Sequence, residues 1–159
     1  MKLEEKIGSI LKASNLKIAT AESCTGGLIA NRITNISGAS EYFEAGFITY
    51  SNRAKTSFLA VPENVITKEG AVSHKVAGLM AEGVKKATDV DIGLSVTGIA
   101  GPVGGTPEKP VGTVYIGISC HAGTFVRFFL FNGAREEIKK QTSDAALMLV
   151  LDCIEGRLT

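Results

Sequence analysis

The spacing of apolar residues along the chain switches between a helical period and short continuous runs. Leu3, Ile7, Ile10 and Leu11 recur at helical spacing and predict an amphipathic helix, whereas the run from Leu16 to Ala21 predicts a strand. Applied to the whole chain, this pattern predicts helices over 3–13, 28–34, 52–59, 74–88 and 134–154, and strands over 16–21, 42–50, 92–97, 111–120 and 124–131. Residues 37–40 are predicted to form a turn, and Pro62 is taken as the signal that ends the helix before it.

Helices that alternate with strands indicate a layered α/β fold, and 159 residues favour one domain over residues 1–159. The last two predicted strands are separated only by His121, Ala122 and Gly123, which indicates a hairpin. The sheet is therefore expected to be mixed rather than purely parallel. The pattern does not fix the order of the strands.

Charge and cysteine usage narrow the class of protein. Seventeen basic and sixteen acidic residues leave a net charge of +1, so nothing favours a nucleic-acid or membrane-surface partner. Cys24, Cys120 and Cys153 form no CxxC pair, and His74 and His121 are too far apart in sequence to form a ligand set, so no metal and no cofactor is expected. No apolar run approaches the ~20 residues of a membrane span, and the charged start does not resemble a signal peptide. We expect a reduced, cytoplasmic protein. Its oligomeric state is left open, and a homo-oligomer is one of the states allowed.

Glycine is the compositional outlier, with 18 residues, and its placement suggests ligand-contacting loops. Ser23 and Thr25 follow the first predicted strand, and Gly26 and Gly27 open the next helix. Such a turn places a hydroxyl beside free backbone N–H groups that can hold an oxyanion or a phosphate. The same residues could instead cap the helix and pack it on the sheet. Cys24 is a rival nucleophile, although it lacks an obvious histidine partner.

A second candidate segment is residues 50–55, in which Lys55 lies one helical turn after Ser51 and is flanked by Ala54 and Phe58. A lysine kept neutral by burial can activate a serine. On its own, however, the segment is more typical of a solvated surface lysine, and Tyr50 is more typical of a strand aromatic than of a catalytic group.

The third candidate is the long loop over 98–110, which contains four glycines and three prolines and follows a predicted buried strand. Loops of this length within one domain are usually functional. Arg135 lies at the start of the last helix, where its positive charge interacts unfavourably with the helix dipole. Its guanidinium is nevertheless well suited to bind a phosphate. The candidate ligand contacts in these two regions are Thr97, Gly98, Gly101, Gly104, Gly105 and Arg135.

Taken together, these motifs resemble the CinA C-terminal domain family, the nicotinamide-nucleotide amidases, over about residues 5 to 155. The matching stretches are Ala-Glu-Ser-Cys-Thr-Gly-Gly at 21–27, Tyr-Ser-Asn-Arg-Ala-Lys at 50–55, Gly-Ala-Val-Ser at 70–73, Thr-Gly-Ile-Ala-Gly-Pro at 97–102 and Gly-Gly-Thr-Pro-Glu-Lys-Pro-Val-Gly-Thr-Val at 104–114. The resemblance implies a three-layer α/β/α fold and hydrolysis of the carboxamide of nicotinamide mononucleotide, a step of pyridine-nucleotide salvage that yields nicotinate mononucleotide and ammonia.

The resemblance also implies roles for individual residues. Ser23 would be the nucleophile and Lys55 its base, with Tyr50 orienting Lys55 or stacking on the pyridine ring. The oxyanion would be held by N–H groups near Thr25, Gly26 and Gly27 or in the 98–105 loop, and Arg135 would meet the 5′-phosphate. The chain departs from the family pattern at Val103, where glycine or aspartate is usual, and at Ala134, where aspartate is usual. A non-catalytic nucleotide-binding or interaction module of the same fold is the alternative.

Overall fold

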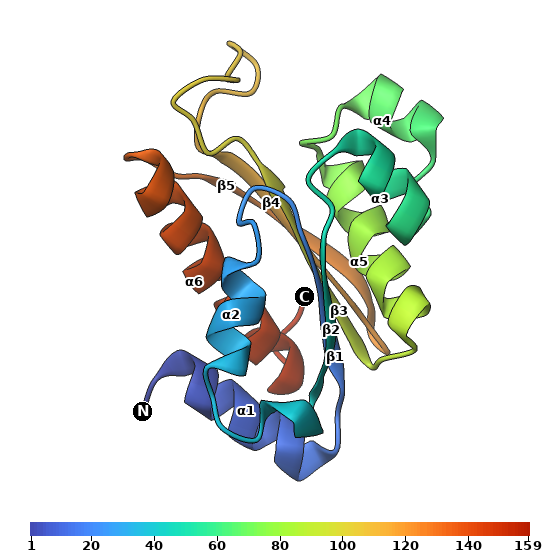
Figure 1. The fold of residues 1–159 in the computed structure, drawn as a ribbon, viewed down its shortest axis with the longest axis vertical. Coiled ribbons are helices and arrows are strands. Elements are labelled where there is room, and N and C mark those ends of the chain that lie inside the picture. The colour runs from blue at the N-terminus through green and yellow to red at the C-terminus, as the bar shows by residue number, and fades with distance from the viewer.

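The computed structural model describes residues 1–159 and contains a five-stranded sheet in the order β2-β1-β3-β4-β5 (Figure 1). β1 pairs in parallel with both β2 and β3, whereas β4 is antiparallel to both of its neighbours, so the sheet is mixed as predicted. The elements are α1 (Leu3–Ser14), β1 (Ile18–Glu22), α2 (Leu28–Thr34), the 3₁₀ helix η1 (Ala39–Glu41), β2 (Phe43–Ile48), α3 (Asn52–Leu59), α4 (Glu63–Glu69), α5 (His74–Thr88), β3 (Ile92–Gly98), β4 (Thr113–Cys120), β5 (Gly123–Leu130) and α6 (Arg135–Ile154).

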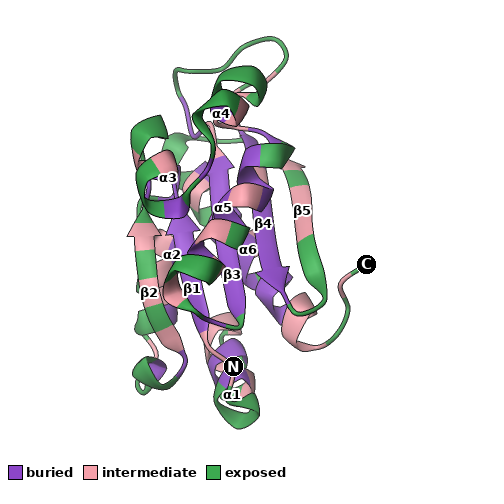
Figure 2. Ribbon diagram, turned by 90° about the vertical axis from the view of Figure 1, so that its right-hand side faces the viewer, coloured by how far each residue is buried: buried purple, intermediate pink, exposed green.

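Helices cover both faces of the sheet, which confirms the three-layer α/β/α architecture. α1, α2 and α6 lie on one face, and α3, α4 and α5 lie on the other (Figure 1). Alternation along β1 divides its side chains between two cores: Ile18 belongs to the core under α1, α2 and α6, while Ala19 and Ala21 belong to the core under α5. The central strands are buried along most of their length, whereas the edge strands β2 and β5 are partly exposed (Figure 2).

One helix was missed by the sequence prediction, because Pro62 was taken only as a stop signal. α3 does end before it, at Leu59, with Ala60 in the left-handed region at φ 58°. Pro62 itself is the N-cap residue of α4, directly before the first turn, where its missing N–H costs nothing. The remaining helices and strands are confirmed, with shifts of a few residues at their ends. The turn predicted over 37–40 leads into η1.

The order of the strands creates a crevice at one edge of the sheet. The chain passes from β1 to β2 through α2 on one face, and from β2 to β3 through α3, α4 and α5 on the other. Ligands in α/β sheets bind where crossovers diverge in this way, outside the carboxyl ends of the parallel strands. Ile48, Glu22 and Val96 are neighbours in register, so the residues that follow them leave the sheet at this edge. No helix has the length and apolar character needed to span a membrane.

Candidate functional site

A cleft of about 280 Å³ opens at this edge, where the carboxyl ends of the three parallel strands meet the start of α6. Its lining contains several of the predicted site residues, namely Ser23, Tyr50, Lys55, Thr97, Gly98, Gly101, Gly104 and Arg135. Thr25, Gly26, Gly27 and Gly105 do not line it. The crevice expected from the strand order thus gathers most of the sequence-predicted residues, which come from segments far apart in the chain.

Ser23 and Lys55 are in direct contact. Lys55 Nζ lies 2.9 Å from Ser23 Oγ and donates a hydrogen bond of 2.7 Å to the carbonyl oxygen of Thr49. Ser51 takes no part in this contact, because its Oγ caps α3 by accepting from the N–H of Ala54. A neutral amine at the position of Lys55 Nζ could accept the serine proton over the same distance.

Lys55 is one of the most buried side chains of the protein, with 1% of its surface exposed, and none of its hydrogen bonds goes to an acid. Burial without a countercharge disfavours the ammonium form and lowers the pKa of Lys55 to about 8. Phe58, expected from the sequence to help shield this lysine, is instead 61% exposed and lies beside Phe47. The lysine is therefore buried by the fold around it rather than by its aromatic neighbour on the helix.

The turn after β1 is organised by a residue that the sequence analysis did not single out. Glu22 is 1% exposed, and its carboxylate accepts hydrogen bonds from Thr25 Oγ1 and from the N–H groups of Ile29 and Ala30. Neither Ser23 nor Thr25 caps α2; its N-cap residue is Gly27, at φ 102°. An acidic residue at the end of an apolar strand is rarely buried unless it has a specific role, so the position of Glu22 in the sequence was the signal that could have identified it.

The loop between β3 and β4 closes another side of the cleft. Thr97 Oγ1 donates to the carbonyl oxygen of Ala71 and so holds the turn before α5 against the cleft. The backbone N–H groups of Ala100 and Gly101, which line the cleft, donate to no acceptor in the chain. The Gly101–Pro102 peptide bond is cis, a point that the sequence left open. Two residues that line the cleft thus have backbone N–H groups without an acceptor in the chain.

The start of α6 reaches the cleft through Arg135. Its guanidinium donates hydrogen bonds of 2.7 Å to the carbonyl oxygen of Gly101 and 2.8 Å to Tyr50 Oη. Tyr50 therefore contacts Arg135 rather than Lys55, and the suggestion that it orients the lysine is not supported. One turn later on α6, Lys139 has no ion-pair partner. Its Nζ lies close to Gly26, 3.7 Å from the position that a Cβ would take if a side chain were added there. The sequence analysis did not identify this second cation.

The rival nucleophile, Cys24, lies in an unfavourable environment. Its thiol is buried, and burial raises its pKa to about 12, so the reactive thiolate does not form near neutral pH. His74 and His121 are exposed, and neither lines the cleft. The geometry therefore favours Ser23 over Cys24.

The fold and the cleft together define a class of protein. It is an α/β/α domain with a buried serine–lysine pair at the edge where the connections from β1 and β2 pass to opposite faces of the sheet. The chain matches the CinA C-terminal domain over residues 1–154 and belongs to this family.

Related proteins and solved structures agree with this assignment. The chain is 54% identical to a "Putative competence-damage inducible protein" of Moorella thermoacetica, over 93% of this chain and 36% of that protein. It is 51% identical to a "CinA-like protein" of Chloroherpeton thalassium, over 98% of this chain and 38% of that protein. It thus spans little more than a third of the length of these relatives.

Among solved structures, the competence/damage inducible protein CihA from Agrobacterium tumefaciens superposes with a TM-score of 0.93 at 38% identity, covering 96% of this chain and 93% of that chain. A CinA superfamily protein from Escherichia coli superposes with a TM-score of 0.87 at 32% identity, covering 94% of this chain and 90% of that chain.

Proposed function

We propose that this domain is an amidase that hydrolyses the carboxamide of nicotinamide mononucleotide to nicotinate mononucleotide and ammonia, with Ser23 as nucleophile and Lys55 as general base. The observation that carries the proposal is the 2.9 Å contact between Ser23 Oγ and a buried lysine that has no acid partner. A module that only bound nucleotides would gain nothing from a lysine whose burial favours the neutral form.

In the proposed reaction, neutral Lys55 takes the hydroxyl proton of Ser23 as the serine oxygen attacks the carboxamide carbon. The free N–H groups of Ala100 and Gly101 are candidates to stabilise the oxyanion, as is the N–H of Cys24, which also lines the cleft and has no acceptor in the chain. Protonated Lys55 then gives its proton to the leaving nitrogen, and ammonia departs. Water next enters, loses a proton to Lys55 and attacks the ester that links the nicotinoyl group to Ser23. The serine oxygen leaves and takes this proton back from Lys55, which restores the neutral lysine.

The phosphate end of the substrate is assigned to the cations of α6. Arg135 lines the cleft, and two of its guanidinium hydrogen bonds already fix its position. Lys139 lies outside the cleft lining, near Gly26, and supplies a second cation free of ion pairs. We further propose that the reaction is a step of pyridine-nucleotide salvage and takes place in the cytoplasm.

Ammonia release from nicotinamide mononucleotide by the purified protein tests this proposal. Ser23→Ala should lower kcat by at least ~10³-fold, because the residue forms the covalent intermediate. Ser57→Ala, an exposed serine on the helix that carries Lys55, is the matched control and should retain activity. A wild-type protein that binds the nucleotide without releasing ammonia would instead support the binding-module alternative.

A further inference from the structure

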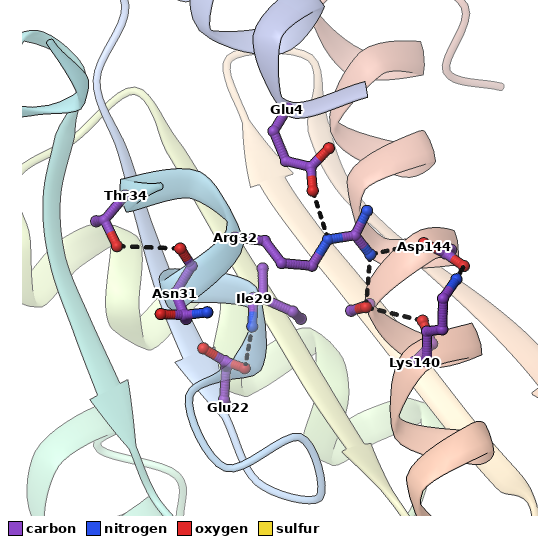
Figure 3. A network of polar contacts seen from close by, with 9 residues as sticks. Glu4, Glu22, Ile29, Asn31, Arg32, Thr34, Lys140 and Asp144 are labelled. Carbon is purple, nitrogen blue, oxygen red and sulfur yellow. Dashed lines mark hydrogen bonds and ion pairs between the residues drawn. The ribbon is translucent and has the colours of Figure 1, made fainter. Parts of the chain in front are cut away.

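Glu22 is a buried acid without a cation partner, directly before the proposed nucleophile. Its carboxylate receives hydrogen bonds of 2.6 Å from Thr25 Oγ1, 2.9 Å from the N–H of Ile29 and 3.0 Å from the N–H of Ala30. Figure 3 shows its side chain pointing from the end of β1 toward the first turn of α2. No lysine or arginine forms an ion pair with it.

The chain is held in place by hydrogen bonds both before and after Ser23. Ahead of the serine, Glu22 is paired in the sheet with Ile48 and Val96. Behind it, the same residue's carboxylate fixes Thr25 and the start of α2. Ser23 itself donates its N–H to the carbonyl oxygen of Val96 and accepts at its own carbonyl from the N–H of Gly26. The backbone of the nucleophile is thereby fixed at each step of the turn.

Because side chains alternate between the two faces along a strand, Glu22 can affect the site although its side chain lies on the opposite face of the sheet. Successive side chains point to opposite faces, so Glu22 faces α2 while Ser23 faces Lys55 on the other side of the sheet. The carboxylate does not line the cleft. Its effect on Ser23 is therefore exerted through the backbone of the turn.

The hydrogen bonds to Glu22 use both of its carboxyl oxygens as acceptors: Oε1 accepts from Thr25 Oγ1 and the N–H of Ile29, and Oε2 accepts from the N–H of Ala30. An ionised carboxylate only accepts hydrogen bonds, and all three groups that reach it are donors. A glutamine would keep one acceptor oxygen but turn an N–H group toward a donor. Charge-assisted hydrogen bonds from a hydroxyl and two amides are also the stronger kind, which suits a fixed geometry.

We propose that Glu22 is a positioning residue: its carboxylate, hydrogen-bonded to Thr25 and to the first turn of α2, fixes the turn that aims Ser23 Oγ at Lys55. This inference rests on the proposed amidase function. It adds that the orientation of the nucleophile depends on an acid that touches neither the substrate nor the lysine. Displacing a reacting group by about 1 Å can cost about 10²-fold in rate, and an effect of this size is expected here.

The test compares Glu22→Gln with Glu4→Gln. Glu4 is the matched control, because it anchors the other end of α2 through an ion pair with Arg32 (Figure 3) and does not line the cleft. Both variants should lower the Tm. Only Glu22→Gln should lower kcat, by about 10²-fold, with KM changed by less than about threefold. The pH at which activity rises should stay the same, since Lys55 is untouched.

A second measurement does not depend on the natural substrate. A small fluorophosphonate phosphonylates an activated serine: the serine oxygen bonds to phosphorus as fluoride leaves, and the mass of the labelled peptide identifies Ser23. The labelling rate should fall in Glu22→Gln by a factor similar to that in kcat and should be unchanged in Glu4→Gln. If Glu22→Gln does not fold, Thr25→Val replaces it: removal of the hydroxyl should slow labelling, and Thr25→Ser should restore most of the rate.

The outcomes separate this inference from the proposed function. Wild-type protein that neither releases ammonia nor labels at Ser23 would overturn the amidase proposal itself. Wild-type protein that labels at Ser23, with Glu22→Gln or Thr25→Val equally reactive, would overturn the positioning role alone. Equal loss of rate in Glu22→Gln and Glu4→Gln would also overturn it, because any weakening of α2 would then suffice.

Discussion

Two cations, the buried Lys55 and the partly buried Arg32, have opposite surroundings. Arg32 lies among Glu4, Ser143 and Asp144 and joins α2 to α1 and α6 (Figure 3). Burial alone would lower the pKa of Arg32, but its hydrogen bonds with the two acids outweigh this effect and leave the pKa raised. Lys55 has no acid beside it, and burial lowers its pKa to about 8.

The difference shows how one fold uses buried charge in two ways. The acids around Arg32 keep it charged, so it fastens helices together. The lysine is left uncompensated, so its neutral form is available for proton transfer near neutral pH. An unpaired buried charge weakens the fold, and such a feature is expected where function requires it. The following predictions test this contrast.

The largest effect should come from exchanging the two kinds of cation. Lys55→Arg keeps a positive charge but cannot lose a proton, so kcat should fall by about 10³-fold. Arg32→Lys, the matched exchange, keeps a positive charge beside Glu4 and Asp144 and should change kcat by less than about threefold. Steady-state ammonia release measures both. Substantial turnover in Lys55→Arg would show that the residue is only a charge contact.

The next effect is the pH dependence of the wild-type protein. Because only neutral Lys55 can take the serine proton, kcat/KM should rise with pH through an ionisation near the lysine pKa of about 8. Below that pH it should fall about tenfold per unit, since the neutral fraction does so. Arg32→Lys should show the same profile. A profile flat between pH 6 and 9 would contradict a basic role for Lys55.

Stability should change in opposite directions at the two positions. The folded pKa of Lys55 lies below its unfolded value, so the cost of its charge is fully present below about pH 8 and disappears toward pH 10.5. Lys55→Met should therefore raise the Tm at pH 7 by a few degrees, or roughly 1–3 kcal/mol, and by less at pH 9.5. Arg32→Met leaves its acid partners unpaired and should lower the Tm. Calorimetry in two buffers measures both shifts, and a lower Tm for Lys55→Met would contradict the view that its charge is uncompensated.

The smallest effect is expected at Cys24. A thiolate there would be a countercharge for Lys55, but burial raises the pKa of this thiol to about 12, so it stays neutral. Cys24→Ala should accordingly change kcat by less than about threefold and leave the pH profile in place. A loss as large as that of Ser23→Ala would instead point to the cysteine as nucleophile.

The sequence predicted most elements and the residues of the cleft, but for unequal reasons. Apolar periodicity predicted every strand and every α-helix except α4, because the two cores leave clear apolar faces. The role of Lys55 rested on the family resemblance, since its burial depends on parts of the fold that lie outside its own segment. Arg135 was predicted as a phosphate contact, but its hydrogen bonds to Tyr50 and Gly101 join residues 85 and 34 positions away and leave no local trace.

The hydrogen bond between Ser23 and Val96 has a consequence for how the protein folds during synthesis. The N–H of Ser23 is held by a strand that is synthesised long after β1, and the cleft is completed only when Arg135 at the start of α6 is in place. Parallel pairing of β1 with β3 closes a long loop, and contacts of this kind form slowly. A nascent or truncated chain that lacks β3 therefore cannot hold Ser23 in place, and the proposed activity should appear only after β3 and the start of α6 have joined the fold.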